Sequence, residues 1–444
     1  MELPERGAAA GPETGKTGFR YVLAQRDFRL IWFAQLAAQL ADKFLMFSLI
    51  ILAYHLSGGS TPVAITLLAY TVPAVVIAPL AGVFADRHDR KRIMVLTNFA
   101  RAALVTLIPL ASLVPAFHGE FIHLLVITFL FSAVGQLFSP AEAAAIPTVV
   151  SKESLITANS MVLMTMVLTL VIGGALAPVV SRVDIYAPYW WAVGLFAGAG
   201  ALILLARIPK TEDRDDADHD RHPFHQLAIE LKEGADALRG SALLLLSFYE
   251  LSLAVLVMFM MFTLAPAYVT QVVGIEAQDS YVILVPATAG ALLSAAVLGQ
   301  TGRNLNRAWL LVGGLLATGL TLLLMAAVPS AMRDVHQLRE SARYVGAVFS
   351  LLLGLEFGAL LIPSLTYLME NTDDSVRGRI FALLFMVVNG VTAIPVLLAA
   401  ALSDFFGITR VIAVLGLLLA GTGLAIARYA TRAFEAGAGP APAR

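Results

Sequence analysis

Three carboxylic acids, Asp42, Glu250 and Glu356, interrupt long apolar stretches of this sequence. An ionisable side chain inside a membrane costs several kcal/mol unless it faces protein or water, so each of these acids marks a candidate functional site. A carboxyl group in a partly dehydrated cavity can bind and release protons near neutral pH, because desolvation disfavours its charged form. We therefore predict that Asp42 and Glu356 couple proton movement to another process, with Glu250 as a third candidate.

A polar stripe surrounds the first of these acids. Its members recur at steps of three or four residues, the spacing of one helix face, and they are Trp32, Gln35, Gln39, Asp42 and Met46. We expect this stripe to face a central cavity. Lys43 points about 100° away from Asp42 on a helix, so we expect it to pair with an acid on another helix or to extend to the interface.

Soft and aromatic side chains could form the walls of such a cavity. The candidates are Met258, Met261, Phe262, Phe385 and Asn389. Flexible methionine surfaces repack around varied ligands, which favours a hydrophobic or amphiphilic small-molecule substrate. The alternative is that these residues simply pack helices together or face lipid.

The composition excludes most other classes of protein. Of 444 residues, 59% are apolar and only 14% are charged, a balance that leaves no room for a soluble catalytic domain. A net charge of -1 gives no indication of nucleic-acid binding, and the absence of cysteine removes disulfides, thiolate metal sites and cysteine nucleophiles. No phosphate-binding G-x-x-x-x-G-K-[ST] motif is present, and no histidine cluster has metal-ligand spacing. We expect no enzyme activity, cofactor or metal.

Apolar runs long enough to cross a membrane predict an all-α fold with twelve transmembrane helices. The expected segments are 28–56, 62–85, 93–116, 120–139, 155–181, 186–207, 241–270, 280–300, 307–328, 342–368, 378–402 and 408–430. An even number places both termini on one side. The segments on that side carry most of the Lys and Arg residues close to the helices, so we predict a cell-membrane protein with cytoplasmic termini.

These helices divide the chain into two halves. We expect a cytoplasmic segment at 1–27, a six-helix half at 28–207, a cytoplasmic linker at 208–240, a second six-helix half at 241–430 and a cytoplasmic tail at 431–444. The linker contains an apolar helix face formed by Phe224, Leu227, Leu231 and Leu238. Such an amphipathic helix is expected to lie on the membrane surface.

An internal repeat supports the same division. An offset of 223 residues superposes Gly135 on Gly358, Pro140 on Pro363 and Ala177 on Ala400. Together with the six-plus-six layout, this indicates two parallel repeats and a mechanism in which two halves rock against each other.

The segment between the second and third helices reads Gly82-Val-Phe-Ala-Asp86-Arg87-His-Asp89-Arg90-Lys91-Arg92. It resembles the loop pattern G-x-x-x-D-R-x-G-R-[KR] of the major facilitator superfamily, with Asp89 in place of a glycine. The resemblance implies that Asp86 and Arg90 help to lock the two halves together on the cytoplasmic side, with Gly82, Arg87 and Lys91 in the same loop. The alternative is a plain basic anchor at the cytoplasmic surface.

Two further stretches resemble the drug and siderophore exporters within that superfamily, which include the macrolide efflux proteins. One runs from Phe138 to Pro147 and continues through Leu155 to Ser160, and the other is Arg377-Gly-Arg-Ile-Phe-Ala382. The resemblance implies a monomeric exporter of small hydrophobic or amphiphilic molecules, driven by exchange with protons or another coupling ion.

Charges near the helix ends are expected to be interfacial. They include Glu142 after the fourth helix, Arg101 near the cytoplasmic start of the third helix, and Asp404 with Arg410 in an outer loop. With Arg101 placed there, no arginine is expected deep in the membrane, which disfavours a dedicated anionic substrate.

Two alternatives to a drug exporter stay open. Lysophospholipid transporters of the same superfamily also carry an acid in the first helix, so lipid movement is the nearest alternative. A membrane enzyme or non-transporting sensor is less favoured, because an enzyme should gather His, Asp or Ser at one interface, whereas these acids lie on separate helices.

Overall fold

The computed structural model describes residues 18–115, 121–209, 223–301, 307–334, 341–372, 379–380, 383–384 and 386–437. A few side chains within these ranges, among them those of Asp86 and Asn389, lie outside the description. All regular elements in the described ranges are helices.

The first half contains nine of these α-helices. They are α1 (Phe19–Ala24), α2 (Arg26–Ser57), α3 (Ser60–Val76), α4 (Ala78–Arg87), α5 (Arg90–Ala111), α6 (Ile122–Gly135), α7 (Phe138–Val149), α8 (Leu155–Val183) and, last in the bundle, α9 (Ala187–Leu205), with α1 being a short lead-in to α2. Pro73 and Pro79 flank the break between α3 and α4 at Ile77. Proline removes a backbone donor, so the second predicted membrane segment is interrupted there.

The second half follows a linker helix, α10 (Pro223–Arg239). Its elements are α11 (Ala242–Tyr268), η3 (Val269–Val273), η4 (Ala277–Ser280), α12 (Tyr281–Thr301), α13 (Arg307–Asp334), α14 (Ala342–Glu370), η7 (Val387–Val391), α16 (Ala393–Phe406) and α17 (Ile408–Gly437). In the described chain, ten helical segments are long and apolar enough to cross a membrane, and α3 and α16 are shorter apolar helices. Together they follow the order and positions of the twelve predicted segments, which confirms the polytopic all-α fold.

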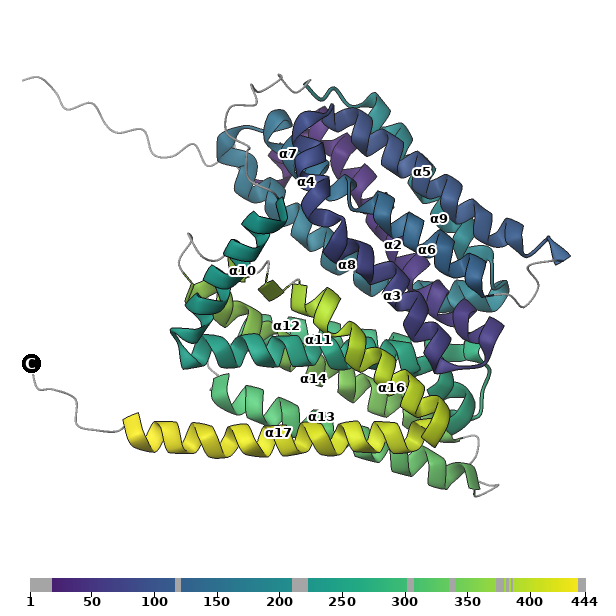
Figure 1. Cartoon of the computed structure of the whole chain (residues 1–444), viewed down its shortest axis with the longest axis vertical. Coiled ribbons are helices and arrows are strands. Elements are labelled where there is room, and N and C mark those ends of the chain that lie inside the picture. The colour runs from purple at the N-terminus through teal and green to yellow at the C-terminus, as the bar shows by residue number, and fades with distance from the viewer. Residues whose placement is uncertain are drawn as a thin grey trace, which may run out of the picture.

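The two halves form separate bundles that meet at one end and diverge at the other. Figure 1 shows α2 to α9 above α11 to α17, with α10 and the carboxyl end of α17 at the divergent end. We call that end the linker side and the opposite end the distal side. On the distal half of the molecule α3 packs against α16 and α8 packs against α12.

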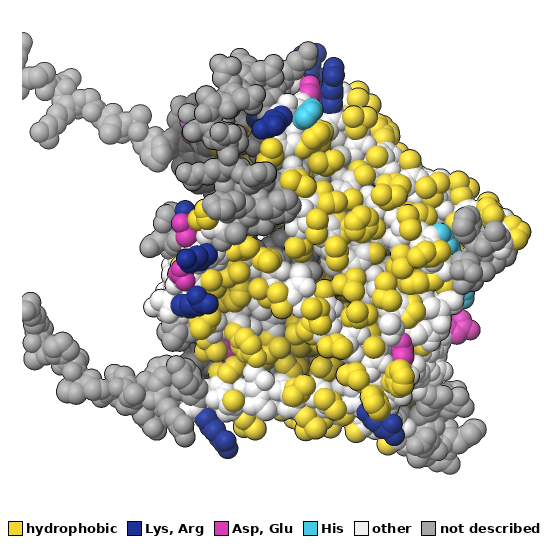
Figure 2. Space-filling view, in the orientation of Figure 1, with side chains coloured by type: hydrophobic (Ala, Val, Ile, Leu, Met, Phe, Trp, Pro, Cys, Tyr) yellow, Lys and Arg dark blue, Asp and Glu magenta, His cyan; other side chains and the backbone are white. Residues whose placement is uncertain are grey.

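The surface agrees with a protein that crosses a membrane. Figure 2 shows a broad apolar face, with the drawn charged side chains gathered at its two ends. Because lipid tails solvate apolar side chains and exclude charges, a surface of this kind fits a bilayer between the linker and distal sides.

The fourth membrane segment is longer than the sequence predicted. It continues from α6 into α7 and ends at Val149 instead of residue 139. Pro140 lies in the first turn of α7, where a missing backbone donor is tolerated. Glu142 is consequently buried within α7 and does not follow the end of the helix, where the sequence placed it.

The linker helix packs on the second half at the linker side, and its predicted position on the membrane surface stays a prediction. Leu238 is buried with Leu244, Phe248, Leu251, Leu368 and Ile380 at the linker side of the second half. Glu233 also forms an ion pair with Arg379, with 2.9 Å between Oε2 and Nε. The side chains of Phe224 and Leu227 lie outside the described residues.

Glycines bring α12 and α14 into backbone contact. A Cβ on Gly354 would lie 1.8 Å from the Ala287 carbonyl oxygen, and one on Gly290 would lie 2.1 Å from that of Leu351. Neither oxygen belongs to a flexible side chain, so only glycine fits at these positions. The two helices therefore form one rigid wall of the second half.

Candidate functional site

An apolar cavity of about 150 Å³ lies mainly within the second half. Helices α11, α12, α13, α14 and α17 form most of it, while Phe47 of α2 and Leu170 and Val171 of α8 come from the first half. Its lining includes the polar side chains of Tyr268, Thr288, Thr318 and Ser350, and the remainder is aliphatic, aromatic or thioether surface. A cavity with this lining suits a largely apolar ligand.

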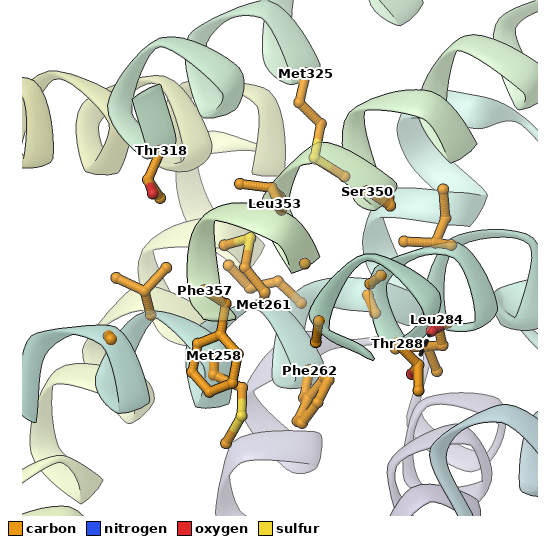
Figure 3. Close-up of a pocket in the computed structure, with 18 of the residues that line it drawn as sticks. Met258, Met261, Phe262, Leu284, Thr288, Thr318, Met325, Ser350, Leu353 and Phe357 are labelled. Atoms are coloured by element: carbon orange, nitrogen blue, oxygen red, sulfur yellow. Dashed lines mark hydrogen bonds between the residues drawn. The ribbon is translucent and has the colours of Figure 1, made fainter. Parts of the chain in front are cut away.

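Three of the five residues predicted as cavity walls line this space. They are Met258, Met261 and Phe262, which Figure 3 shows together with Phe357 on one side of the cavity. Phe262 also meets Phe47 edge to face, with 5.1 Å between ring centroids, so the two halves touch at the cavity wall. Phe385 and the Asn389 side chain lie outside the described residues.

Asp42 is the centre of a charged cluster in the first half. Its carboxylate accepts hydrogen bonds from Tyr70 Oη at 2.5 Å and from Lys43 Nζ at 3.1 Å. It also forms an ion pair and a hydrogen bond with the guanidinium group of Arg101. Lys43 thus bonds its own chain neighbour, whereas the sequence predicted a partner on another helix or at the interface.

Arg101 is the main functional candidate that sequence reasoning misplaced. Its guanidinium carbon lies 4.3 Å from the ring centroids of both Phe131 and Phe196, and the residue is buried. Gly135 leaves room for it, because a Cβ there would lie 3.3 Å from the same guanidinium group. Arg101 follows the start of α5 by eleven residues, which places it about 16 Å along the helix axis. Contrary to the expectation, an arginine does lie deep in a membrane-spanning segment.

The rest of the predicted polar stripe of α2 is not among the residues that line this cavity. Trp32 donates from Nε1 to Thr165 Oγ1 of α8 at 3.0 Å. Gln35 is buried with neither amide atom hydrogen-bonded, Gln39 is half-buried, and Met46 is buried.

A small apolar cluster connects the charged group to the cavity. It consists of Phe44, Met46, Phe47 and Ala177, with Tyr70 and Phe262 packed against it. Tyr70 bonds Asp42, and Phe262 lines the cavity. The charged group is therefore separated from the cavity by a single layer of side chains.

The two glutamates of the second half differ from Asp42 in their surroundings. Glu356 Oε1 accepts a hydrogen bond from Thr321 Oγ1 at 2.6 Å, while Oε2 is buried with no partner in the described part of the chain. Thr318, one turn before Thr321 on α13, lines the cavity. Glu250 is fully buried on α11, and among the described residues neither of its carboxyl oxygens has a hydrogen-bond partner.

The conspicuous basic loop braces the first half internally. Arg90 Nη1 donates to the Ala144 carbonyl at 2.9 Å, and Lys91 Nζ donates to the carbonyls of Leu204 at 2.8 Å and Ala206 at 2.7 Å. The Asp89 carboxylate accepts from Arg92 N at 3.0 Å and so caps α5, which explains an acid where the family pattern has glycine.

The remaining predicted residues of this loop make fewer contacts in the described part of the chain. Gly82 lies within α4 and has no neighbour within 4 Å of a Cβ position, and Arg87 ends α4 with an exposed side chain. The Asp86 side chain lies outside the described residues, so its role in a lock between the halves stays a prediction.

Contacts between the halves gather on the distal side. Asp404 accepts hydrogen bonds from the backbone amides of Ser60 and Thr61, both at 2.7 Å. Asp404 lies in the last turn of α16 and Arg410 in the first turn of α17, not in the loop that the sequence predicted.

Two further pairs join the halves on this side. The hydroxyls of Tyr54 and Thr270 are 2.7 Å apart. Arg182 forms an ion pair with Asp279, with 3.2 Å between Nε and Oδ1, and donates to Tyr281 Oη at 2.5 Å. The distal side is therefore held closed by polar contacts, while the bundles diverge on the linker side (Figure 1).

Two helical bundles that both contribute to one apolar cavity fit a multi-pass membrane transporter of small molecules better than an enzyme. The model of the Major Facilitator Superfamily matches residues 31–395, and this chain belongs to that superfamily.

Sequence relatives and solved structures agree with this assignment. The MFS-type transporter YvqJ of Bacillus subtilis is 23% identical over 413 residues, covering 90% of this chain and 92% of its own. Macrolide efflux protein A of Streptococcus pyogenes is 21% identical, covering 86% and 91%.

Among solved structures, a bacterial homologue of the lysosomal transporter Spinster in an inward-facing, unoccupied conformation has a TM-score of 0.64 at 13% identity. It covers 96% of this chain and 99% of its own. The nucleoside transporter NupG also has a TM-score of 0.64, at 12% identity, with coverage of 90% and 98%. These structural likenesses extend to the fold.

Proposed function

We propose that this transporter exports small hydrophobic or amphiphilic molecules from the cytoplasm by alternating access, in exchange for protons. The observation that carries the proposal is the almost wholly apolar cavity to which both halves contribute side chains. A site lined by both bundles changes its exposure when the bundles rock, which is the requirement for alternating access.

The direction follows from the proposed orientation. The linker side, where the bundles diverge, is taken as cytoplasmic because the loops predicted for that side carry most of the Lys and Arg residues. The molecule is then closed to the outside by its distal contacts and receives substrate from within. The similarity to macrolide efflux protein A supports efflux, since that relative is named for it.

Asp42, Glu356 and Glu250 are the proposed coupling carboxylates. The three carboxylates differ in their charged neighbours. Asp42 is bound to two cations, whereas the described residues place no cation against either glutamate. A carboxyl group with a free oxygen beside a cavity can exchange a proton without first breaking an ion pair. Glu356, next to the cavity residues on α13 and α14, is the strongest of the three by this criterion.

A lysophospholipid-type transporter is the second candidate function. The charged cluster one layer behind an apolar cavity favours it, because a lysophospholipid carries a charged head group on an apolar chain. This alternative shares the fold and the cavity and differs only in the substrate.

Both candidates are tested by transport into proteoliposomes that contain the purified protein and an imposed pH gradient. A macrolide, a hydrophobic dye and a lysophospholipid are supplied in parallel, and internal pH is followed together with substrate uptake. We expect gradient-driven uptake of at least one, with proton movement in the opposite direction. Equal uptake by the wild type with and without the gradient would contradict proton coupling. Unchanged gradient-driven uptake in both Asp42→Asn and Glu356→Gln would contradict coupling through these residues.

A further inference from the structure

The charged cluster around Asp42 carries more positive than negative charge. Lys43 and Arg101 both bind the single carboxylate of Asp42, so the group has a net charge of about +1 when all three are ionised. Tyr70, the third partner of Asp42, is a neutral donor. Burying an uncompensated charge is costly, so a positive cluster at this depth calls for an anion.

The acids that the structure describes in other membrane segments do not supply that anion. Glu142, Glu250 and Glu356 are inside helices, and no ion pair joins any of them to Lys43 or Arg101 in the described part of the chain. Arg101 instead has aromatic rings on two sides, which stabilise a cation without neutralising it.

Lys43 also retains unused hydrogen-bond donors. Its ammonium group has three donors, and within the described residues it bonds Asp42. The Lys43 and Asp42 side chains are 21% and 16% exposed, so the cluster is open to a ligand at one edge. An anion can therefore add to this group without displacing Asp42.

The cavity lies within reach of the same ligand. Phe47, which lines the cavity, follows Asp42 by five residues on α2, an axial distance of about 7.5 Å. Tyr70 and Phe262 pack against the same intervening cluster. A molecule with a charged end and an apolar body of modest length can span both environments.

We propose that the substrate is an amphiphile with an anionic head group, a carboxylate or a phosphate, that binds Lys43 and Arg101 while its apolar part occupies the cavity. The proposal rests on the transport function above and specifies its substrate class. It reverses the expectation from sequence, which disfavoured anionic substrates because Arg101 was placed at the interface.

A series of ligands with one apolar chain and different head groups tests the proposal. The probes are oleic acid, oleoyl lysophosphatidic acid, oleylamine and oleyl alcohol, measured for binding to the full chain in nanodiscs and for transport in proteoliposomes. We expect the two anions to bind about tenfold more tightly than the amine and the alcohol, because charge-assisted hydrogen bonds form only with an anion. The carboxylate and phosphate arms show which head group is preferred.

Lys43→Met is the matching variant, since methionine keeps the apolar stem that packs against Gly173 and removes the charge. It should lower anion binding about tenfold and leave oleyl alcohol unchanged, while Lys43→Arg should retain the preference for anions.

Equal binding of amine and anion by the wild-type protein, or no binding by any probe, would overturn the anionic substrate without relying on any variant. Transport of oleylamine in that case would leave the export proposal intact. Anion binding with no transport of any probe would instead contradict export and preserve the head-group assignment.

Discussion

The carboxylate of Asp404, at the end of α16, accepts a hydrogen bond from the backbone amide of Ser60, at the start of α3 in the opposite half, over 2.7 Å. The first amides of a helix lack partners within the helix, and the helix dipole favours an anion at that end. Asp404 therefore caps a helix that belongs to the other bundle, and the cap exists only while the distal side is closed.

Asp404→Ala should shift the protein toward a state open on the distal side. A capping carboxylate contributes about 0.5–2 kcal/mol, so the population of the open state should rise about tenfold. The chain contains no cysteine, so Thr288→Cys in the cavity provides a unique label. Its reaction with a membrane-impermeant maleimide added outside cells should become faster.

Asp184→Ala is the matched control for this experiment. Asp184 accepts from the Tyr186 amide at 2.7 Å near the start of α9, but both residues belong to the same half. Its loss should not change labelling. Equal acceleration by both variants would show that the effect comes from general loosening.

Breaking the pair of Asp42 and Arg101 from one side should be more damaging than removing both charges. Arg101→Gln leaves Asp42 with Lys43 and Tyr70, and breaking a buried ion pair costs about 3–5 kcal/mol. The double variant with Asp42→Asn should recover at least about 1 kcal/mol of that loss. Thermal unfolding of the four proteins in one detergent gives the coupling energy, and simple additivity would contradict a direct interaction.

The backbone contact between α12 and α14 should not tolerate a single added methyl group. Gly354→Ala places a Cβ 1.8 Å from the Ala287 carbonyl oxygen, so we expect loss of folded protein in fluorescence-detected size-exclusion chromatography. Gly313→Ala is the control, because no atom lies within 4 Å of its Cβ position on α13. It should be neutral or slightly stabilising, as alanine restricts the unfolded chain. Similar yields for the two variants would show that the helices can separate without cost.

Glu356→Gln should separate exchange from proton-driven transport. Glutamine keeps an acceptor for Thr321 but cannot titrate, so we expect gradient-driven flux to fall at least about tenfold while substrate exchange at equal pH on both sides persists. Glu276→Gln, at an exposed position just before η4, is the control and should resemble wild type. If Glu356→Gln kept full gradient-driven flux, coupling would have to lie elsewhere.

The sequence predicted the membrane helices well, because long apolar runs are a local feature. The methionine-rich face that it singled out on α11 lines a cavity, and its part in substrate binding stays a prediction. The predicted limit of the fourth helix was less accurate. Pro140 fits the first turn of α7, so the fourth segment continues for another ten residues to Val149 and takes Glu142 with it. Burial of that acid depends on tertiary packing, which the local pattern does not contain.

Arg101 shows why the charged cluster could not be assembled from the sequence. A cation near a basic loop looks interfacial, and its deep position depends on α5 beginning at Arg90. Its aromatic partners, Phe131 and Phe196, come from α6 and α9, and these pairings are set by how the helices pack. Asp404 presents the same difficulty, since its partner amides lie more than 340 positions earlier in the chain.

The close contact of α12 and α14 at Gly290 and Gly354 limits which ligands the cavity can accept. Gly354 fixes the backbone of α14 against α12, so that wall cannot retreat to admit a bulkier molecule. Met258 and Met261 on the facing helix α11 have several rotatable bonds each and can change shape without moving a backbone. Substrates should therefore be able to differ in the part that contacts the methionines. The part that contacts α12 and α14 should keep the same shape from one substrate to the next.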